Sequence, residues 1–541
     1  MSHANTSPTK ALVLFGIKQT LKGGLILGFL VGLLVSVQGL GYAASYPDQK
    51  SRDQFAASLA SAPGLGILYG EAKNMATPAS YTVYRAVAVV GLIAAVWGLM
   101  TSTRLLRGQE EDGHWETITS GNTTPRKASL AILAGYSVSI FIAFLITTVM
   151  TAAMGLSPDV SLTLGTSALI ALAIFLPALL FTAVGLLVSQ LSFSRRRALL
   201  YGLVPLLALF TIRSIANTVS DLYFLKQLTP FGWTDMISPV IDPQLQWILP
   251  FAIFIPVIAF IGAYLVGKRD LGEALLPERT TVKSHFFLLK NPFQLTIRQN
   301  ASSYLFWAIG IVLMSIIIAT VTNVASDAVA DSPALTKSVT QLGGSPEDLK
   351  IAFIGAGMIF VVIALLIMAA VSLASVRKDE AKNYLDNLLV QPIHRSSWLI
   401  MRLIIIAVAF VGSMLLSTFV TWLVAHGQGI SIDLGTFLLV SLALVGPVVF
   451  TLGIGTLLYG LWPRLAAVGM YIVLGWSFLV DLIGSVITLN DFVVNTSLFH
   501  YMSLSPATLP DWMTFSWLTG LGLLMMAIGI IAFTKRDITA E

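Results

Sequence analysis

Long apolar runs alternate with short polar links along the whole chain. Each run holds about 20 residues or more, which is the length that an α-helix needs to cross about 30 Å of hydrocarbon. The pattern predicts twelve such runs. They lie at about 24–44, 82–102, 129–152, 164–189, 198–218, 246–266, 303–323, 351–375, 398–424, 432–458, 465–487 and 513–534. The expected fold class is therefore an all-α polytopic membrane protein.

The second six runs repeat the landmarks of the first six. The tripeptide Lys-Arg-Asp follows both the sixth and the last run, at 268–270 and 535–537. A basic residue followed by Gln precedes both the first and the seventh run, at 18–19 and 298–299. Landmarks that recur in the same order indicate an internal duplication. We expect two homologous six-helix halves, related as parallel repeats about an axis along the membrane normal.

This repeat divides the chain into three parts. Residues 1–270 form the first transmembrane half, and residues 303–541 form the second. Between them, residues 271–302 form a polar connector. Basic, partly apolar leads at 10–22 and 292–302 predict an interfacial helix before the first span of each half.

A charged segment is also written twice, once after the second run of each half. The two copies read RGQEEDGHWETITSGN (107–122) and RKDEAKNYLDNLLVQP (377–392), and they align without a gap. Apolar positions at helical spacing predict an amphipathic helix in each copy. A single charge run is usually a solvated loop, but a repeated one in the same place favours a shared role outside the membrane.

These two segments resemble the cytoplasmic signature of type-2 ABC exporter permeases, in the fused twelve-span form of bacterial antibiotic and multidrug exporters. The resemblance covers nearly the whole chain. It implies that 104–127 and 376–397 are coupling helices that dock on a separate ATPase subunit. The residues matching the signature are Arg107, Glu110, Glu111, Gly113 and Glu116 in the first half, and Arg377, Glu380, Asp386 and Pro392 in the second. The chain departs from the family at Asn383, where the family has glycine, and at Asn122, where it has proline.

The composition of the chain excludes several classes of functional site. Only 11% of the 541 residues are charged, against about 25% in soluble domains. The absence of cysteine excludes disulfides and thiolate metal sites, and the six histidines occur singly. With no GxxxxGK[ST] phosphate loop, ATP and Mg²⁺ are expected on two copies of a partner ATPase. The net charge of +5 comes without a basic and aromatic platform for nucleic acid.

Orientation follows from the basic residues. With both termini in the cytoplasm, most of the 32 Lys and Arg residues fall on the cytoplasmic side, as the positive-inside rule requires. We therefore expect both charged segments inside the cell, and the resemblance implies that the membrane is the bacterial cytoplasmic membrane.

Two formal charges lie well inside predicted spans, Arg213 in the fifth and Asp481 in the eleventh. Aligning the two halves places them at equivalent positions, and charges within a membrane face an interior or find a partner. We expect an ion pair between them that acts as part of an outer gate. The alternative is that Arg213 reaches the interface and Asp481 caps a helix or binds water.

The substrate path is expected along the second and fifth spans of each half, because these spans line it in the resembling family. Large, soft side chains there suit amphipathic or hydrophobic cargo such as antibiotics, drugs or lipids. The candidates are Trp97, Tyr201, Phe210, Met358, Met470, Trp476 and Phe478. Pro- and aromatic-rich segments at 228–243 and 498–512 predict partly re-entrant lids.

Two other function classes compete with an ATP-driven exporter. A proton-coupled secondary multidrug transporter has the same number of spans, but it requires a relay of carboxylates within the membrane. A membrane enzyme acting on lipids requires catalytic Asp, Glu or His residues converging at one face. The sequence offers one carboxylate inside a span and no such convergence. It thus favours a permease without its own catalytic site.

Overall fold

The computed structural model describes residues 7–60, 69–120, 123–218, 220–276, 288, 291–330, 349–381, 385, 394–484, 489–502 and 510–537. Within these residues the chain forms helices and turns and no strand. Twelve helices of the described part are long and apolar enough to cross a membrane. This confirms the predicted class, an all-α polytopic membrane protein.

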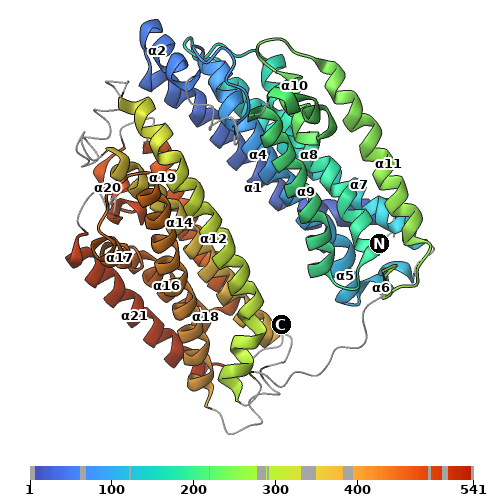
Figure 1. Cartoon of the computed structure of the whole chain (residues 1–541). Helices are drawn as coiled ribbons and strands as arrows, with labels where there is room; N and C mark the ends of the chain where they lie inside the picture. The colour runs from blue at the N-terminus through green and yellow to red at the C-terminus, as the bar shows by residue number, and fades with distance from the viewer. Residues whose placement is uncertain are drawn as a thin grey trace. The chain divides into compact units, whose positions relative to one another are not determined.

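The chain divides into two compact units, Met1–Val282 (the first half) and Lys283–Glu541 (the second half). The first half contains α1 (Pro8–Ser45), α2 (Gln49–Ala60), α4 (Pro78–Thr103), the π-helical turn η2 (Arg104–Gly108), α5 (Gln109–Glu111), α6 (His114–Thr119), α7 (Pro125–Gly155), α8 (Leu164–Leu191), α9 (Arg195–Thr218), η3 (Ser220–Leu228), α10 (Pro230–Ile237), η4 (Leu245–Ile248) and α11 (Leu249–Val266). Figure 1 shows α5 and α6 at one end of this half and α10 at the other.

The second half repeats this order of long helices. It contains α12 (Pro292–Ala330), α14 (Leu349–Ala381), α16 (Arg395–Gly427), α17 (Leu434–Ala443), α18 (Gly446–Leu461), η5 (Pro463–Leu465), α19 (Ala466–Gly484), α20 (Asp491–Val494), η6 (Phe499–Tyr501) and α21 (Trp512–Lys535). The run predicted as one span at 432–458 is thus two helices, α17 and α18, with a short break between them.

The basic leads are not separate interfacial helices. The lead at 10–22 and the first span form the single helix α1, and the lead at 292–302 continues into α12. No proline separates either lead from its span, and α1 runs through Gly23 and Gly24 without a break.

Three helices of the first half begin with the same two-residue signal, Thr followed by Pro. Proline suits the first helical position because its missing N–H has no partner there, and the threonine hydroxyl accepts a free backbone N–H. The hydroxyls of Thr77, Thr124 and Thr229 accept from the N–H three residues ahead, at 3.3, 3.4 and 3.0 Å, which begins α4, α7 and α10.

Small residues let the helices of the first half approach closely. Gly16, Gly24 and Gly28 of α1 face α7, and a Cβ on Gly24 would lie 2.6 Å from the Ser139 carbonyl oxygen. Beside them the hydroxyls of Thr20 and Ser139 lie 2.7 Å apart. Small residues at four-residue spacing are typical of helix packing in membranes, where close contact and hydrogen bonds replace the hydrophobic drive.

The second half uses the same devices at other helix pairs. Gly453 and Gly460 of α18 lie against Gly522 and Gly529 of α21. Between α12 and α16 a hydroxyl pair again bridges the helices, with Ser315 Oγ 2.6 Å from the hydroxyl of Ser417.

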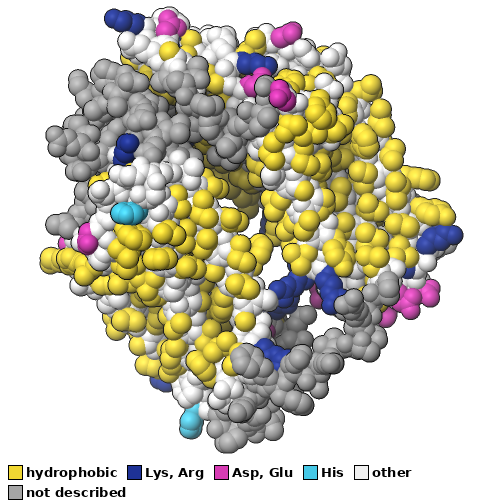
Figure 2. Space-filling view, viewed as in Figure 1, with side chains coloured by type: hydrophobic (Ala, Val, Ile, Leu, Met, Phe, Trp, Pro, Cys, Tyr) yellow, Lys and Arg dark blue, Asp and Glu magenta, His cyan; other side chains and the backbone are white. Residues whose placement is uncertain are grey.

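Large hydrophobic side chains also cover the outside of the spans, as expected for helices that face lipid. Among them Val149 and Phe260 in the first half and Leu305 in the second are more than half exposed. Figure 2 shows hydrophobic side chains over the flanks of each half.

Candidate coupling segment

The segment predicted as one amphipathic coupling helix has two short helices in the first half. Span two continues from α4 through η2 into α5 without a break and ends at Glu111. Gly113 then adopts a left-handed backbone, with φ of +76°, and α6 begins at His114. A Cβ on Gly113 would meet no described atom within 4 Å, so space does not require glycine there. The positive φ does, because other L-residues adopt it at a cost.

Trp115 fixes α6 against the end of span two. Its indole lies buried, and Nε1 donates to the carbonyl oxygen of Leu106 at 3.0 Å. Leu106 lies in the π-helical turn η2, and such turns commonly occur at functional sites. Thr119 closes α6 by donating to the Trp115 carbonyl at 2.8 Å.

Glu110 does not face solvent but lies at the centre of a buried ion cluster. Its two carboxylate oxygens accept from Arg269 at 2.6 Å each, and Arg107 Nη1 lies 3.1 Å away. The backbone N–H of Gly272 donates to it at 2.7 Å. The side chains of Arg107, Glu110 and Arg269 are 2%, 6% and 6% exposed. We call these three residues the first-half tie.

Other donors of the tie reach two further segments. Arg107 donates to the carbonyls of Phe193, Gly272 and Glu273 at 2.8, 3.3 and 3.0 Å. Arg269 donates through Nε to Gln190 Oε1 on α8 at 2.8 Å. The tie therefore joins the ends of the second, fourth and sixth spans.

An equivalent contact occurs in the second half. Glu380 accepts from Arg536 Nη2 at 2.7 Å and from the hydroxyl of Tyr459 at 2.7 Å. Glu380 is buried, with its side chain 3% exposed. Arg536 occupies the same place in the second Lys-Arg-Asp tripeptide as Arg269 does in the first. We call Glu380, Arg536 and Tyr459 the second-half tie.

The structure thus separates the predicted coupling residues into two groups. Arg107, Glu110 and Glu380 face inward and hold the segment in place. Glu111, Gly113 and Glu116 are exposed, and Arg377 is half-buried. The other predicted positions, Asn383, Asp386 and Pro392, lie outside the described residues.

The exposed surface of the segment is acidic. We define the α5–α6 face as Glu111, Asp112, His114 and Glu116, all of which are exposed. Sequence reasoning found two of these four residues through the family signature. It missed the partners of the ties, although the repeated Lys-Arg-Asp tripeptide that contains Arg269 and Arg536 was a visible signal.

The two members of the predicted gate pair, Arg213 and Asp481, lie in different halves. Arg213 pairs with Asp235 of α10: Nε lies 2.7 Å from Oδ2 and Nη2 lies 2.9 Å from Oδ1. Arg213 also donates to the Tyr69 carbonyl at 3.1 Å. Asp481 accepts from Ser497 at 3.4 Å. Each charge therefore has a partner within its own half: Asp235 on the short helix α10 for Arg213, and Ser497 in the link between α20 and η6 for Asp481.

The predicted cavity residues have several different surroundings. Met358 and Met470 are fully buried in the core of the second half, so they are packing residues. Tyr201 and Trp476 are exposed, and Phe210 and Phe478 are half-buried.

Trp97 lines a cavity of about 390 Å³ between α1 and α4. Its ring contacts Tyr136 at a centroid distance of 5.1 Å, which holds it in place. Basic side chains border the same cavity, namely Lys22, Arg104 and Arg195.

In the described part of the chain, twelve helices long and apolar enough to cross a membrane, with polar segments held at their ends, define a multi-pass membrane protein. Residues 289–534 match the family described as the C-terminal domain of the multidrug efflux system permease Rv1217c. The chain is also 28% identical over 507 residues to the multidrug efflux system permease protein Rv1217c of Mycobacterium tuberculosis (strain ATCC 25618 / H37Rv). That match covers 91% of this chain and 88% of the relative. The two matches confirm the resemblance to multidrug exporter permeases.

Proposed function

We propose that the chain is the membrane-spanning subunit of an ATP-driven exporter. Both termini lie in the cytoplasm, and the α5–α6 face docks on a separate ATPase subunit, two copies of which bind ATP and Mg²⁺. The observation that carries the proposal is the first-half tie. It fixes a short, exposed, acidic segment to the ends of three spans, so a displacement of the segment moves those spans with it.

The geometry suits transmission of a movement. Trp115 and Gly113 set the position of α6 relative to η2, and the tie prevents α5 from turning independently of α8 and α11. Packed helices and buried ion pairs switch between discrete arrangements more readily than they deform. A partner that pulls on the α5–α6 face therefore moves the helices of the first half together.

The cargo is expected to be amphipathic or hydrophobic. The cavity beside Trp97 supports this, because the Trp97 ring and Met100 line it and basic side chains border it. Such a surface accepts an apolar body with a polar or acidic group. Tyr201 and Trp476 are further candidates on the exposed faces of spans five and eleven.

Reversal of the exposed charges tests the docking role without disturbing the tie. We expect the double variant Glu111→Lys/Glu116→Lys to unfold at the wild-type temperature and to lose co-purification of the proposed partner ATPase. Asp159→Lys is the matched control, since Asp159 is an exposed acid in the link between α7 and α8. It should leave the ATPase bound.

The proton-coupled alternative gives the opposite result. In vesicles containing the purified chain alone, a proton gradient would then drive export, and the Glu111→Lys/Glu116→Lys variant would export as well as the wild type. An ATP-driven permease moves no cargo under these conditions until the ATPase and ATP are added.

A further inference from the structure

Three basic side chains converge on the cavity beside Trp97. Lys22 comes from α1, Arg104 from the turn η2 at the end of span two, and Arg195 from the start of α9. No carboxylate is among the described residues that line this cavity of about 390 Å³. A cleft lined by charges of one sign concentrates ions of the opposite sign. The lining of this cavity therefore has a surplus of positive charge that attracts an anion.

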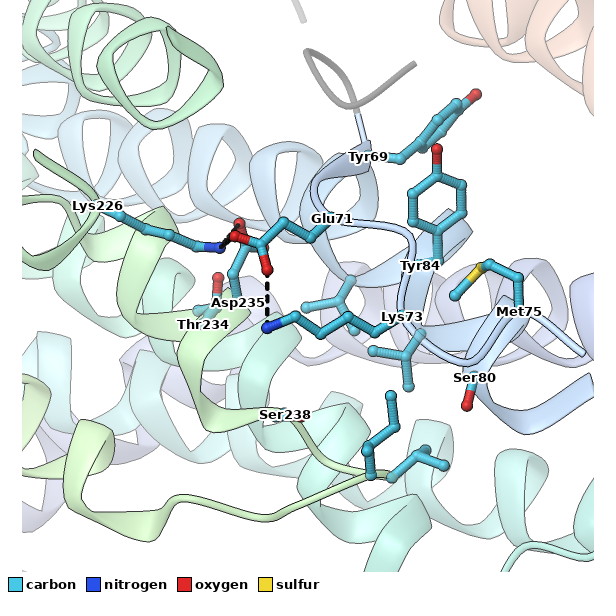
Figure 3. A pocket seen from close by; sticks show the side chains of 14 residues that line it. Tyr69, Glu71, Lys73, Met75, Ser80, Tyr84, Lys226, Thr234, Asp235 and Ser238 are labelled. Atoms are coloured by element: carbon cyan, nitrogen blue, oxygen red, sulfur yellow. Dashed lines mark hydrogen bonds and ion pairs between the residues drawn. The ribbon is translucent and has the colours of Figure 1, made fainter. Parts of the chain in front are cut away.

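A second cavity of the first half, about 70 Å³ in volume and near α10, has the opposite arrangement. Figure 3 shows the Glu71 carboxylate between the ammonium groups of Lys73 and Lys226, with Asp235 beside them. Glu71 lies 2.7 Å from Lys73 Nζ and 3.4 Å from Lys226 Nζ. Burial alone would raise the pKa of Glu71, but its hydrogen bonds and the charges of both lysines outweigh this and hold the pKa below its ordinary value. Two cations meet two carboxylates in that lining, so no charge is left over for a ligand.

Donors at the cavity beside Trp97 lack acceptors in the described part of the chain. The Lys22 ammonium forms no hydrogen bond or ion pair there, and the indole N–H of Trp97 donates to no described atom. Arg104 donates a single hydrogen bond, from Nη2 to the Gln19 carbonyl oxygen at 3.4 Å. Ammonium and guanidinium groups have several donors each and no acceptor. They are therefore available to a ligand that only accepts, such as a phosphate.

Arg195 is the one cation of the three with acidic neighbours. It is half-buried, and it interacts electrostatically with Arg104, which disfavours its charge, and with Glu111 and Asp112, which favour it. Both acids belong to the exposed α5–α6 face, and neither lines the cavity. They offset part of the charge of Arg195 from outside and leave the cavity without an acceptor of its own.

Exposed apolar side chains continue from the cations along both helices. On α1, Ile26 lies four residues beyond Lys22 on the same face and is 61% exposed. On α4, Met100 and Ile93 lie four and eleven residues before Arg104, again on one face, and are 42% and 48% exposed. The cations thus stand at the ends of spans, with apolar surface leading away from them into the spans. This order matches an amphiphile that has an acidic head and an apolar tail.

We propose that this cavity binds an acidic phospholipid of the membrane, with its phosphate among the three cations and an acyl chain along the apolar faces of α1 and α4. Basic pockets between helices, at the level where spans end, are suited to anionic head groups. Guanidinium and ammonium groups donate strong charge-assisted hydrogen bonds to phosphate oxygens. The cavity is also the proposed cargo surface, but the lipid can occupy it whether or not it is moved. An acidic cargo would have to displace the lipid.

The test uses the purified full-length chain in a neutral detergent, titrated with phosphatidylglycerol or with phosphatidylcholine of the same acyl chains. Both lipids carry a phosphate, but the choline ammonium cancels its charge. Native mass spectrometry measures the binding of the first lipid, and tryptophan fluorescence follows thermal unfolding. We expect phosphatidylglycerol to bind about tenfold more tightly. It should also raise the unfolding temperature saturably, because a ligand that binds only the folded state stabilises it.

Substitution of the cations should remove this preference. Lys22→Gln and Arg104→Gln should each weaken the binding of phosphatidylglycerol about tenfold, because each removes charge-assisted hydrogen bonds. Binding of phosphatidylcholine should change little. Both side chains are exposed, so the variants should fold. The matched control is Lys127→Gln, since Lys127 is an exposed lysine at the start of α7 that does not line the cavity. It should bind like the wild type.

Each outcome decides for or against the site. The site is rejected if phosphatidylglycerol binds no more tightly than phosphatidylcholine, or if the Lys22→Gln/Arg104→Gln double variant keeps wild-type affinity. It is also rejected if Lys127→Gln weakens binding equally, since any basic surface residue would then suffice. If the double variant does not fold, Lys22→Gln alone decides by the same criterion.

Two further ligands test other occupants. Inorganic phosphate that stabilises the chain as strongly as phosphatidylglycerol would show a site for a free anion and overturn the lipid. Dodecyl phosphate represents an acidic amphipathic cargo, and its binding without that of phosphatidylglycerol would likewise overturn the lipid. None of these measurements involves an ATPase, so their failure leaves the proposed docking role untouched.

Discussion

Replacing Glu110 by glutamine should destabilise the permease itself rather than only release its partner. The substitution removes one negative charge from the first-half tie while keeping the size of the side chain. Arg107 and Arg269 then remain as two buried guanidinium groups without a carboxylate between them. If Glu110 holds the segment in place, the variant loses stability. If Glu110 contacts the ATPase, the variant keeps its stability and loses the ATPase.

The size of the effect follows from burial and geometry. Glu110 accepts two bonds from Arg269 at 2.6 Å and one from the Gly272 N–H at 2.7 Å. Breaking a buried ion pair by removing one partner costs about 3–5 kcal/mol, because the other charge stays buried and unpaired. Glutamine can keep some hydrogen bonds but not the charge. We therefore expect a loss in the free energy of unfolding within that range.

The assay is thermal or denaturant-induced unfolding of the purified permease without any ATPase. Glu111→Gln is the matched control, because Glu111 is the neighbouring glutamate and is exposed. Exposed charges away from special contacts change stability by about 0.5 kcal/mol or less. The reasoning is refuted if Glu110→Gln unfolds like the wild type and yet loses the ATPase, since Glu110 would then act at the partner surface.

Three further predictions concern other contacts. Tyr459→Phe should lower the free energy of unfolding by about 1.5–3 kcal/mol, because it removes a hydrogen bond to the buried carboxylate of Glu380. The unfolding temperature of this variant should lie between those of the wild type and Glu380→Gln. Gly135→Ala should lower the unfolding temperature and the yield of monodisperse protein, because the new Cβ would collide with the backbone of Val13 on α1. The pKa of Glu71 lies below its ordinary value of 4.5, so its contribution is present above pH 4.5 and is lost as acidification passes through the lowered pKa. The stability difference between the wild type and Glu71→Gln should therefore be largest near neutral pH and disappear in acid.

Each of these has a control within the chain. Tyr471 is an exposed tyrosine of α19, and Tyr471→Phe should be neutral. A Cβ added at Gly412 would meet no described atom within 4 Å, so Gly412→Ala should stabilise α16 by about 0.5–1 kcal/mol, opposite in sign to Gly135→Ala. An equal fall for both glycine variants would contradict the close approach of α1 and α7. A stability difference at Glu71 that grows in acid would contradict the ion pairs around it.

The spans were predictable from the sequence because hydropathy reports the solvent that a segment meets. The direction of individual side chains was not. Glu110 and Glu380 were recognised as a repeated pair, but their charge suggested solvent, and the structure turns both inward. Glu110 meets Arg269 across 159 residues of sequence. No local pattern joins two positions so far apart, although the glutamate and the Lys-Arg-Asp tripeptide each occur once in each half.

Local sequence patterns also failed to identify the partner of Arg213 and the burial of two cavity candidates. Arg213 was matched with Asp481 by aligning the halves, whereas its partner Asp235 lies 22 residues further along the chain. Asp235 sits on α10, which is too short for a clear helical pattern and was expected to be a lid. Met358 and Met470 lie in spans that are apolar on every face. Periodicity there does not distinguish a core position from one facing lipid or cargo.

The two ties have a consequence for how such a protein can be divided. Each tie is closed by residues of a single half, Glu110 with Arg269 and Glu380 with Arg536. None of these residues comes from the connector beyond Leu276. Fission of the gene at that point would therefore leave both ties intact, and two half-length polypeptides would each retain the contacts that fix their own charged segment. The half, rather than the full chain, is then the smallest unit that keeps its charged segment fixed to its spans.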